Sequence, residues 1–201
     1  MSSLYMNTIS ELFKAHKLKE ISQNYKPNEI IKNLSFKDGM LLGYQLLLND
    51  EMDDILREYA VNLIEENRQA HPKEWDEDWR NDIFLGDAYY LIMKYEERYE
   101  AYKRASKKVF PAPPALLVSL AGCYLLPGSP ITLDKAERLV LEALGKEKTI
   151  EAATLIRGIY KTKGNIDKYY YWDEILQKLE NENTYMKDKW PKFLSNSDLA
   201  P

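Results

Sequence analysis

The stretch LGDAYYLIMKYEERYEAYKRA, residues 85–105, places small residues, tyrosines and charges at regular offsets. Its small and apolar residues recur every three or four positions, which is the spacing of one face of an α-helix. The same spacing continues through almost the whole chain, and alternating strand patterns joined by tight hairpin turns are missing. The sequence therefore predicts an all-α protein.

Breaks between the helical segments follow from local chemistry. Ser10 can cap a first helix that runs to about Asn24, and Pro27 prevents its continuation. After a short segment at 29–34, Ser35 or Asp38 can begin the next helix. Residues 69–81 interrupt the periodicity and are predicted as either a loop or the polar start of a helix. The remaining helices are expected in pairs, at 40–48 and 52–67, 82–93 and 96–109, 115–125 and 133–144, and 149–162 and 167–180.

An internal repeat explains the pattern in residues 85–105. Aligning the first helices of the later pairs brings Tyr89, Tyr124 and Tyr160 into register, at intervals of 35 and 36 residues. A helix-turn-helix unit of about 34 residues is the period of a tetratricopeptide repeat. The residues that resemble the signature of this family are Leu85, Gly86, Tyr89, Tyr95, Tyr102, Ala105 and Pro111.

The other units resemble the family with departures. The second keeps Leu120, Ala121, Tyr124, Ala136, Val140 and Ala143, but its turn is about three residues longer, as in the related Sel1-like repeats. The third has Arg157 at the expected small position and Tyr169 at the expected alanine. Arg98 also replaces an expected alanine, so either the packing opens there or its guanidinium extends to solvent. Upstream, Leu42 and Gly43 resemble the start of the repeat signature more weakly. The resemblance therefore covers residues 82–178 and, loosely, 36–67.

The resemblance implies a short tetratricopeptide-like α-solenoid of stacked helical hairpins, with N-terminal helices and a C-terminal cap. A single hairpin cannot cover its own apolar face, so adjacent pairs stack to bury a continuous core. We expect a single domain over residues 1–201. Its parts are an N-terminal helical region (1–35), a degenerate pair with an acidic connector (36–81), three repeats (82–180) and a capping segment with a frayed tail (181–201).

Composition narrows the class of partner. The chain has 45% hydrophobic and 30% charged residues and a net charge of −4, which is typical of a globular protein and disfavours nonspecific nucleic-acid binding. One cysteine excludes an internal disulfide, and the first residues lack a secretory signal pattern, so a cytoplasmic location is expected. The longest apolar stretch, 115–126, is too short to span a bilayer and predicts a buried helix rather than a membrane contact.

Catalytic signatures are absent from the sequence. His16 and His71 lie in different segments without metal-ligand spacing, and both are predicted to be structural. Cys123, within an apolar stretch, is predicted to be a packed thiol rather than a nucleophile. There is no GxSxG elbow, phosphate loop or dinucleotide fingerprint. We therefore expect no enzyme activity, cofactor or metal, with an enzyme of dispersed catalytic residues as the alternative.

Two binding surfaces are predicted instead. The first is an acidic strip flanked by tryptophans, whose carboxylates would steer a basic protein and whose rings would supply buried area: Trp75, Asp76, Glu77, Asp78 and Trp79. A solvated acidic face is the simpler interpretation. The second follows from the resemblance, because tetratricopeptide arrays bind peptides or proteins in a groove lined by the first helix of each pair. The matching positions are Arg80, Ile83, Asp87, Tyr90, Ala115, Val118, Gly122, Leu125, Glu151, Thr154, Gly158 and Lys161.

These features predict a non-catalytic protein that binds another protein. The acidic balance suits a bacterial immunity protein that neutralises a cognate toxin with a basic domain, which is an analogy from fold and charge. A secretion chaperone, or an adaptor that binds peptides in the repeat groove, is the alternative.

Overall fold

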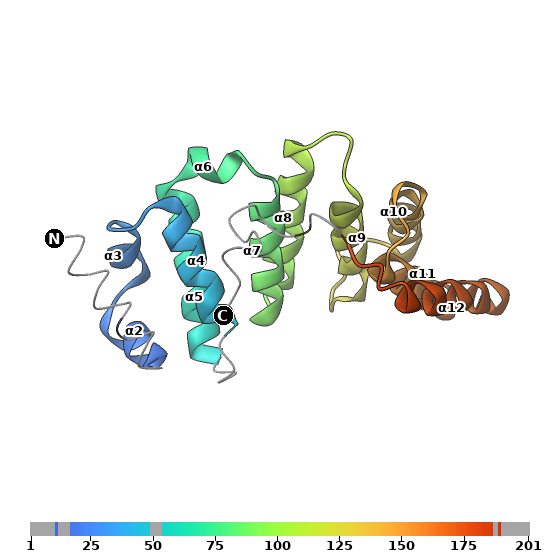
Figure 1. Ribbon diagram of the computed structural model, residues 1–201, viewed down its shortest axis with the longest axis horizontal. Helices are drawn as coiled ribbons and strands as arrows, with labels where there is room; N and C mark the ends of the chain where they lie inside the picture. Colours follow the sequence, from blue (N-terminus) through green and yellow to red (C-terminus); the bar gives the residue numbers. More distant parts are fainter. Residues whose placement is uncertain (1–10, 12–16, 49–53, 187–188, 190–201) are drawn as a thin grey trace. The chain divides into compact units, whose positions relative to one another are not determined.

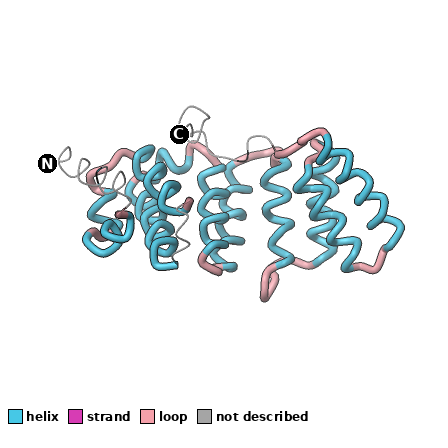
Figure 2. Tube along the Cα trace, turned by 60° about the horizontal axis from the view of Figure 1, so that its bottom comes forward, coloured by secondary structure: helices cyan, strands magenta, loops and turns pink. Residues whose placement is uncertain are grey.

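The computed structural model describes residues 11, 17–48, 54–186 and 189, and these residues are arranged as helices that pack in adjacent pairs (Figure 1). They form eleven α-helices and one 3₁₀ turn, and no strand occurs among them (Figure 2). The prediction of an all-α protein is therefore confirmed. The chain divides into two compact units. We call the described residues up to Lys94 unit 1 and those from Tyr95 onward unit 2.

Unit 1 is organised around its longest helix, α5. Leu56, Ala60 and Leu63 lie on one stripe of α5 and are buried, as the helical period requires. This helix contacts α2, α3, α4, α6 and α7. The bounds are α2 Leu18–Asn24, α3 Pro27–Ile31, α4 Phe36–Leu47, α5 Asp54–Ala70, α6 Pro72–Asp76 and α7 Arg80–Leu91.

The α4 and α5 helices approach each other closely at a glycine. A Cβ atom on Gly43 would lie 2.5 Å from Cγ1 of Ile64, which is far inside the van der Waals distance. At the start of α4, the Asn67 side chain donates a hydrogen bond to the Phe36 carbonyl at 3.0 Å. Ser35 begins α4 by accepting a hydrogen bond from the Asp38 amide, so the first of the two predicted helix starts is confirmed.

Unit 2 contains two helical pairs with one shared core, and α8 packs against α9. The α9 and α10 helices pack together, α11 packs on α12, and α10 contacts α11. Small residues such as Ala121 and Ala136 let the helices approach, and Ile156, Tyr160 and Trp172 fill the space between them. The bounds are α8 Tyr95–Lys108, α9 Pro114–Gly122, the 3₁₀ turn η1 Cys123–Leu125, α10 Leu133–Lys146, α11 Ile150–Thr162 and α12 Ile166–Asn181.

Helix starts in unit 2 follow the predicted breaks. Thr132, Thr149 and Asn165 each accept a hydrogen bond from the amide three residues later, which caps α10, α11 and α12. Gly164 adopts a φ of +68° in the α11–α12 turn, a conformation that favours glycine. The described residues after α12 turn back onto α11, because the Ile150 amide donates to the Thr184 carbonyl at 2.9 Å.

The structure departs from the expected helices in two places. Residues 69–81 contain the short helix α6 and the start of α7, where a loop or a single polar helix start was predicted. The predicted helix over 115–125 ends at Gly122 and continues as η1, so Tyr124 lies in a 3₁₀ turn while Tyr89 and Tyr160 lie in α-helices. The predicted start of the first helix at Ser10 and most of the expected tail lie outside the described residues.

None of the helices in the described ranges is long and apolar enough to cross a membrane.

Candidate protein-binding surfaces

The corner between α6 and α7 is fixed from inside by a tryptophan. Trp75 is 2% exposed, and its indole Nε1 donates to Oδ1 of Asp82 at 3.2 Å. The buried Asn81 side chain donates to the Trp75 carbonyl at 3.1 Å. Two buried polar residues thus position one buried ring. The predicted strip required Trp75 to offer its ring to a partner, but the ring lies inside and supports the corner.

The outer side of this corner is acidic. Glu74, Asp76 and Glu77 are exposed. Asp78 is half-buried and forms an ion pair with Arg80, whose Nε lies 2.9 Å from Oδ1. Residues 73–80 hold four acidic and two basic side chains, so the corner carries an excess of negative charge.

Trp79 is the aromatic member of the predicted strip that retains some exposed surface. It is half-buried, and the Arg80 guanidinium lies 5.9 Å from the centre of its ring. The structure therefore brings Asp76, Glu77 and Trp79 to one exposed corner, while Trp75 lies beneath it and Asp78 is paired.

The predicted groove positions fall in both units. Ile83 of α7 is 1% exposed and Ala115 of α9 is 3% exposed, so neither offers a side chain to a ligand. Leu125 is 64% exposed. Of the remaining positions, Tyr90, Thr154 and Lys161 are exposed, and the half-buried ones are Arg80, Asp87, Val118, Gly122, Glu151 and Gly158.

Within unit 2, the first helices of two successive pairs contact each other. The Tyr124 hydroxyl lies 3.7 Å from the position of a Cβ atom on Gly158, and it shares a hydrogen bond with Thr162. Burial raises the pKa of Tyr124, and the bond to Thr162 lowers it by a smaller amount. At the other end of α11, the Glu151 carboxylate accepts a hydrogen bond from the Met186 amide at 3.2 Å. This predicted groove position is therefore engaged by the chain itself.

A cluster of charges joins α10 to the α11–α12 turn, and the sequence analysis missed it. Lys163 forms ion pairs with Asp134 and Glu137. Hydrogen bonding to Lys163 lowers the pKa of both carboxyls. Burial, together with the neighbouring Glu137, raises the pKa of Tyr160 to about 12. The i, i+3 spacing of the two carboxylates was the available signal, but the lysine is 26 or more residues away.

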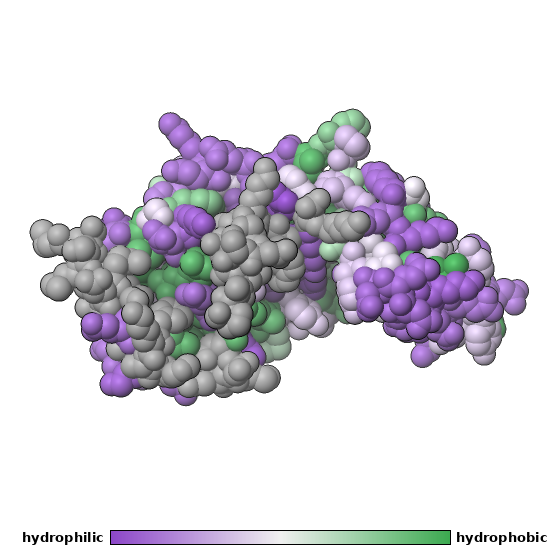
Figure 3. Space-filling model, viewed as in Figure 1, coloured by the Kyte–Doolittle hydropathy of each residue, from purple (hydrophilic) through white to green (hydrophobic). Residues whose placement is uncertain are grey.

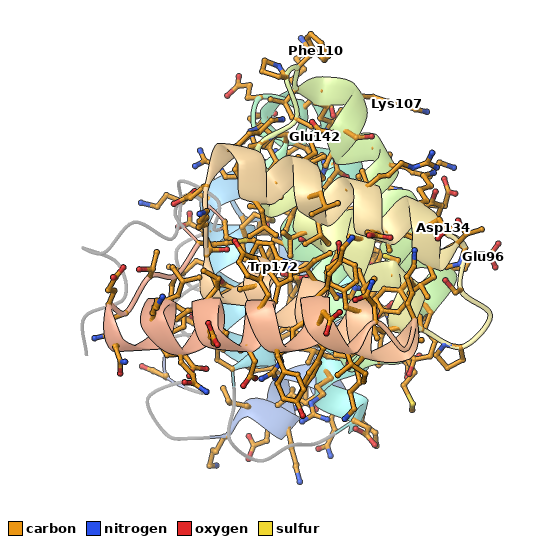
Figure 4. The ribbon with its side chains drawn as sticks, turned by 90° about the vertical axis from the view of Figure 1, so that its right-hand side faces the viewer. Glu96, Lys107, Phe110, Asp134, Glu142 and Trp172 are labelled. Atoms are coloured by element: carbon orange, nitrogen blue, oxygen red, sulfur yellow. The ribbon has the colours of Figure 1, made fainter. Side chains whose placement is uncertain are left out.

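Exposed apolar side chains also occur on unit 2. Phe110, in the loop between α8 and α9, is 97% exposed and extends away from the helices (Figure 4). Tyr170 and Tyr171 of α12 are exposed as well, although the visible face over this helix is mainly hydrophilic (Figure 3). Isolated apolar residues are common on protein surfaces, and contact area for a partner needs several together.

The residues considered for catalysis have structural surroundings where they are described. His71 is half-buried, with Nδ1 3.9 Å from the Glu74 carboxylate and its ring edge-on to Phe36. Cys123 is buried, and its thiol donates to the Ser119 carbonyl. His16 lies outside the described residues. In the described part of the chain, no three His, Cys, Asp or Glu side chains come together as metal ligands.

Comparison of the chain with models of known protein families found no match, and comparison with curated proteins found none. Its function is therefore inferred from the side chains themselves.

Proposed function

We propose that this protein acts without catalysis, by binding a basic protein, and that it belongs to the tetratricopeptide-like helical arrays. The observation that carries the proposal is the acidic corner between α6 and α7. Asp76 and Glu77 are exposed there on a backbone held by the buried Trp75 and its hydrogen bond to Asp82. A rigid corner loses little conformational entropy on binding, and its carboxylates accelerate encounter with a basic surface.

The specific role we propose is that of a bacterial immunity protein, which occupies a cognate toxin with a basic domain. Stoichiometric inhibition requires only a preformed complementary surface. The alternative is an adaptor or secretion chaperone, supported by the exposed Leu125, Thr154 and Lys161 near the contact between α9 and α11. An inhibitor binds one folded protein over a large area, whereas an adaptor binds several segments weakly.

Affinity capture from the native host at moderate salt, with mass spectrometry and stoichiometry, tests the proposal. The paired variant Asp76→Lys/Glu77→Lys keeps the Asp78 to Arg80 ion pair and reverses the exposed charge. Its control is Glu174→Lys/Glu180→Lys, which makes the same charge change at exposed positions of α12.

We expect a single one-to-one basic partner whose association at low salt slows about tenfold or more in the first variant and much less in the control. Several partners at low occupancy would favour the adaptor. Reproducible absence of a partner, or equal slowing in both variants, would contradict the proposal.

A further inference from the structure

Unit 2 contains a pocket that lies outside both predicted surfaces. Its volume is about 480 Å³, which is within the usual range for ligand pockets. Tyr95 and Glu96, the first two residues of α8, form one wall, and Pro127, Gly128 and Pro130 of the α9–α10 turn form the other. These two segments are about 30 residues apart in the sequence.

The pocket wall is preformed. Ser129, between the two wall prolines, donates a hydrogen bond to the Ile131 carbonyl at 2.6 Å, and its hydroxyl lies 3.2 Å from the Cys123 carbonyl. Leu126 and Ile131 are buried on either side of the turn. Gly128 has a φ of +66° with open space where a side chain would begin. The turn is thus anchored at both ends, and no side chain from Gly128 fills the pocket.

The chemistry of the lining favours a cation. Pro127 and Pro130 have no N–H to donate to an anion, and the amides at the start of α8 carry a partial positive charge of only about half a unit, which the full negative charge of Glu96 outweighs. The charged group in the lining is the carboxylate of Glu96, which is exposed and forms no ion pair with another described residue. In Figure 4 its side chain extends outward from the start of α8. Tyr95 adds an aromatic side chain to the same wall.

A guanidinium fits this combination better than an ammonium. It is planar and weakly hydrated, it stacks on aromatic and other flat surfaces, and it binds a carboxylate through two parallel hydrogen bonds. A lysine ammonium would retain the attraction to Glu96 but lose the stacking and the second hydrogen bond. From these observations we propose that the pocket receives an arginine side chain of the protein partner. This inference rests on the proposed function, because it names a side chain through which a basic partner is recognised.

The test uses the full chain labelled with ¹⁵N, titrated with acetyl-arginine-amide as the probe and observed at the amide resonances of Gly128 and Glu96. Acetyl-citrulline-amide, which has the same shape without the charge, is the control ligand. The matched protein variants are Glu96→Gln, in the pocket wall, and Glu97→Gln, the adjacent exposed carboxylate that does not line the pocket.

We expect weak, saturable arginine binding that shifts both resonances, about three- to fivefold weaker binding of citrulline, and about three- to fivefold weaker arginine binding in Glu96→Gln, because the carboxylate is exposed. Glu97→Gln should change the affinity less than about twofold, and added salt should weaken binding of arginine but not citrulline. Equal affinities for the two ligands, shifts confined to other resonances, or equal losses in the two variants would overturn the assignment.

The outcome is separable from that of the proposed function. Capture of a basic partner by a protein that does not bind arginine at Gly128 would leave the proposed function intact and refute the pocket assignment. Arginine binding without any captured partner would support the pocket and contradict its use in partner recognition.

Discussion

The α4–α5 pair of unit 1 and the α11–α12 pair of unit 2 are both helical hairpins, but their interfaces are built in opposite ways. In the first pair the helices approach closely because Gly43 has no side chain, which places the α4 backbone against Ile64. In the second pair the helices pack around a large side chain, because Trp172 is buried in the core shared with α10 and α11 (Figure 4). Adding a single carbon at Gly43 should therefore destabilise the α4–α5 pair, and removing side-chain atoms from Trp172 should destabilise the α11–α12 pair.

The same contrast appears at the position where a small residue is expected. Gly43 occupies it in α4, whereas α11 has Arg157 there. The Arg157 guanidinium forms an ion pair with Asp173 of α12 at 2.6 Å, and both side chains are about one-third exposed. An exposed ion pair contributes little to stability, so the packing of α11 on α12 depends on the buried aromatic side chains rather than on this contact.

The largest expected effect is from Trp172→Ala. Truncating a buried tryptophan removes its apolar contacts and leaves a cavity, which costs about 3–5 kcal/mol of the free energy of unfolding. Urea denaturation followed by circular dichroism measures the loss. Tyr171→Ala is the matched control, because Tyr171 is the exposed neighbour of Trp172, and it should cost less than about 1 kcal/mol. Equal losses would show that unit 2 does not depend on the buried ring.

A smaller effect of opposite origin is expected from Gly43→Ala. The new methyl would overlap Ile64 and force the helices apart, at a cost of about 1–3 kcal/mol. Gly145→Ala is the control, since Gly145 is in α10 with nothing within 4 Å of its Cβ position. That substitution should raise stability by about 0.5–1 kcal/mol through helix propensity. Stabilisation by both substitutions would show that α4 and α5 are not in close contact at this point.

The smallest expected effect is a loss of stability of unit 2 in acid, through the ion pairs of Lys163. The α4–α5 contact between Gly43 and Ile64 contains no ionisable group, so it should not share this dependence on pH. Lys163 lowers the pKa values of Asp134 and Glu137 from their ordinary values of 3.8 and 4.5. Their stabilising contribution is therefore present above those ordinary values and is lost as the pH falls through the lower values of the folded state.

Lys163→Met should remove part of this acid sensitivity in thermal melts recorded between neutral pH and pH about 3. Lys161→Met, at an exposed position of α11, is the control and should leave the profile unchanged. Identical profiles for Lys163→Met and the unsubstituted protein would contradict a role for the cluster. At high pH the sign reverses for Lys163, whose pKa is raised, so its contribution persists through neutral pH and is lost only as the pH rises above its ordinary value of 10.5.

Helix positions were largely predictable because they depend on neighbouring residues. Ser35 and Thr149 cap helices through amides three residues away, and Gly164 with Asn165 ends one helix and begins the next. The position of Trp75 was not predictable in this way. Its interior location depends on Asp82 and on the Phe36 ring, and contacts of this kind leave no periodic signal in the sequence.

The sites show the same division. The acidic corner was predictable from composition, but the pairing of Asp78 with Arg80 depends on side-chain geometry. The pocket was not predictable, because Glu96 and Pro130 meet only when the start of α8 packs beside the α9–α10 turn. For Arg98, the sequence left open whether the helix packing opens at this position or the guanidinium extends to solvent. The half-buried guanidinium instead folds back on its own helix and donates to the Tyr102 hydroxyl at 2.9 Å.

The two buried indoles have a practical consequence. Trp75 belongs to unit 1 and Trp172 to unit 2, so the described residues include one buried indole in each unit. The sequence has four tryptophans, so replacing Trp79, Trp190 and one of the two buried indoles with phenylalanine leaves the other as the single tryptophan and a reporter of its own unit. Coincident denaturant midpoints for the two emitters would identify a single cooperative transition, and separate midpoints would show that each unit melts by itself.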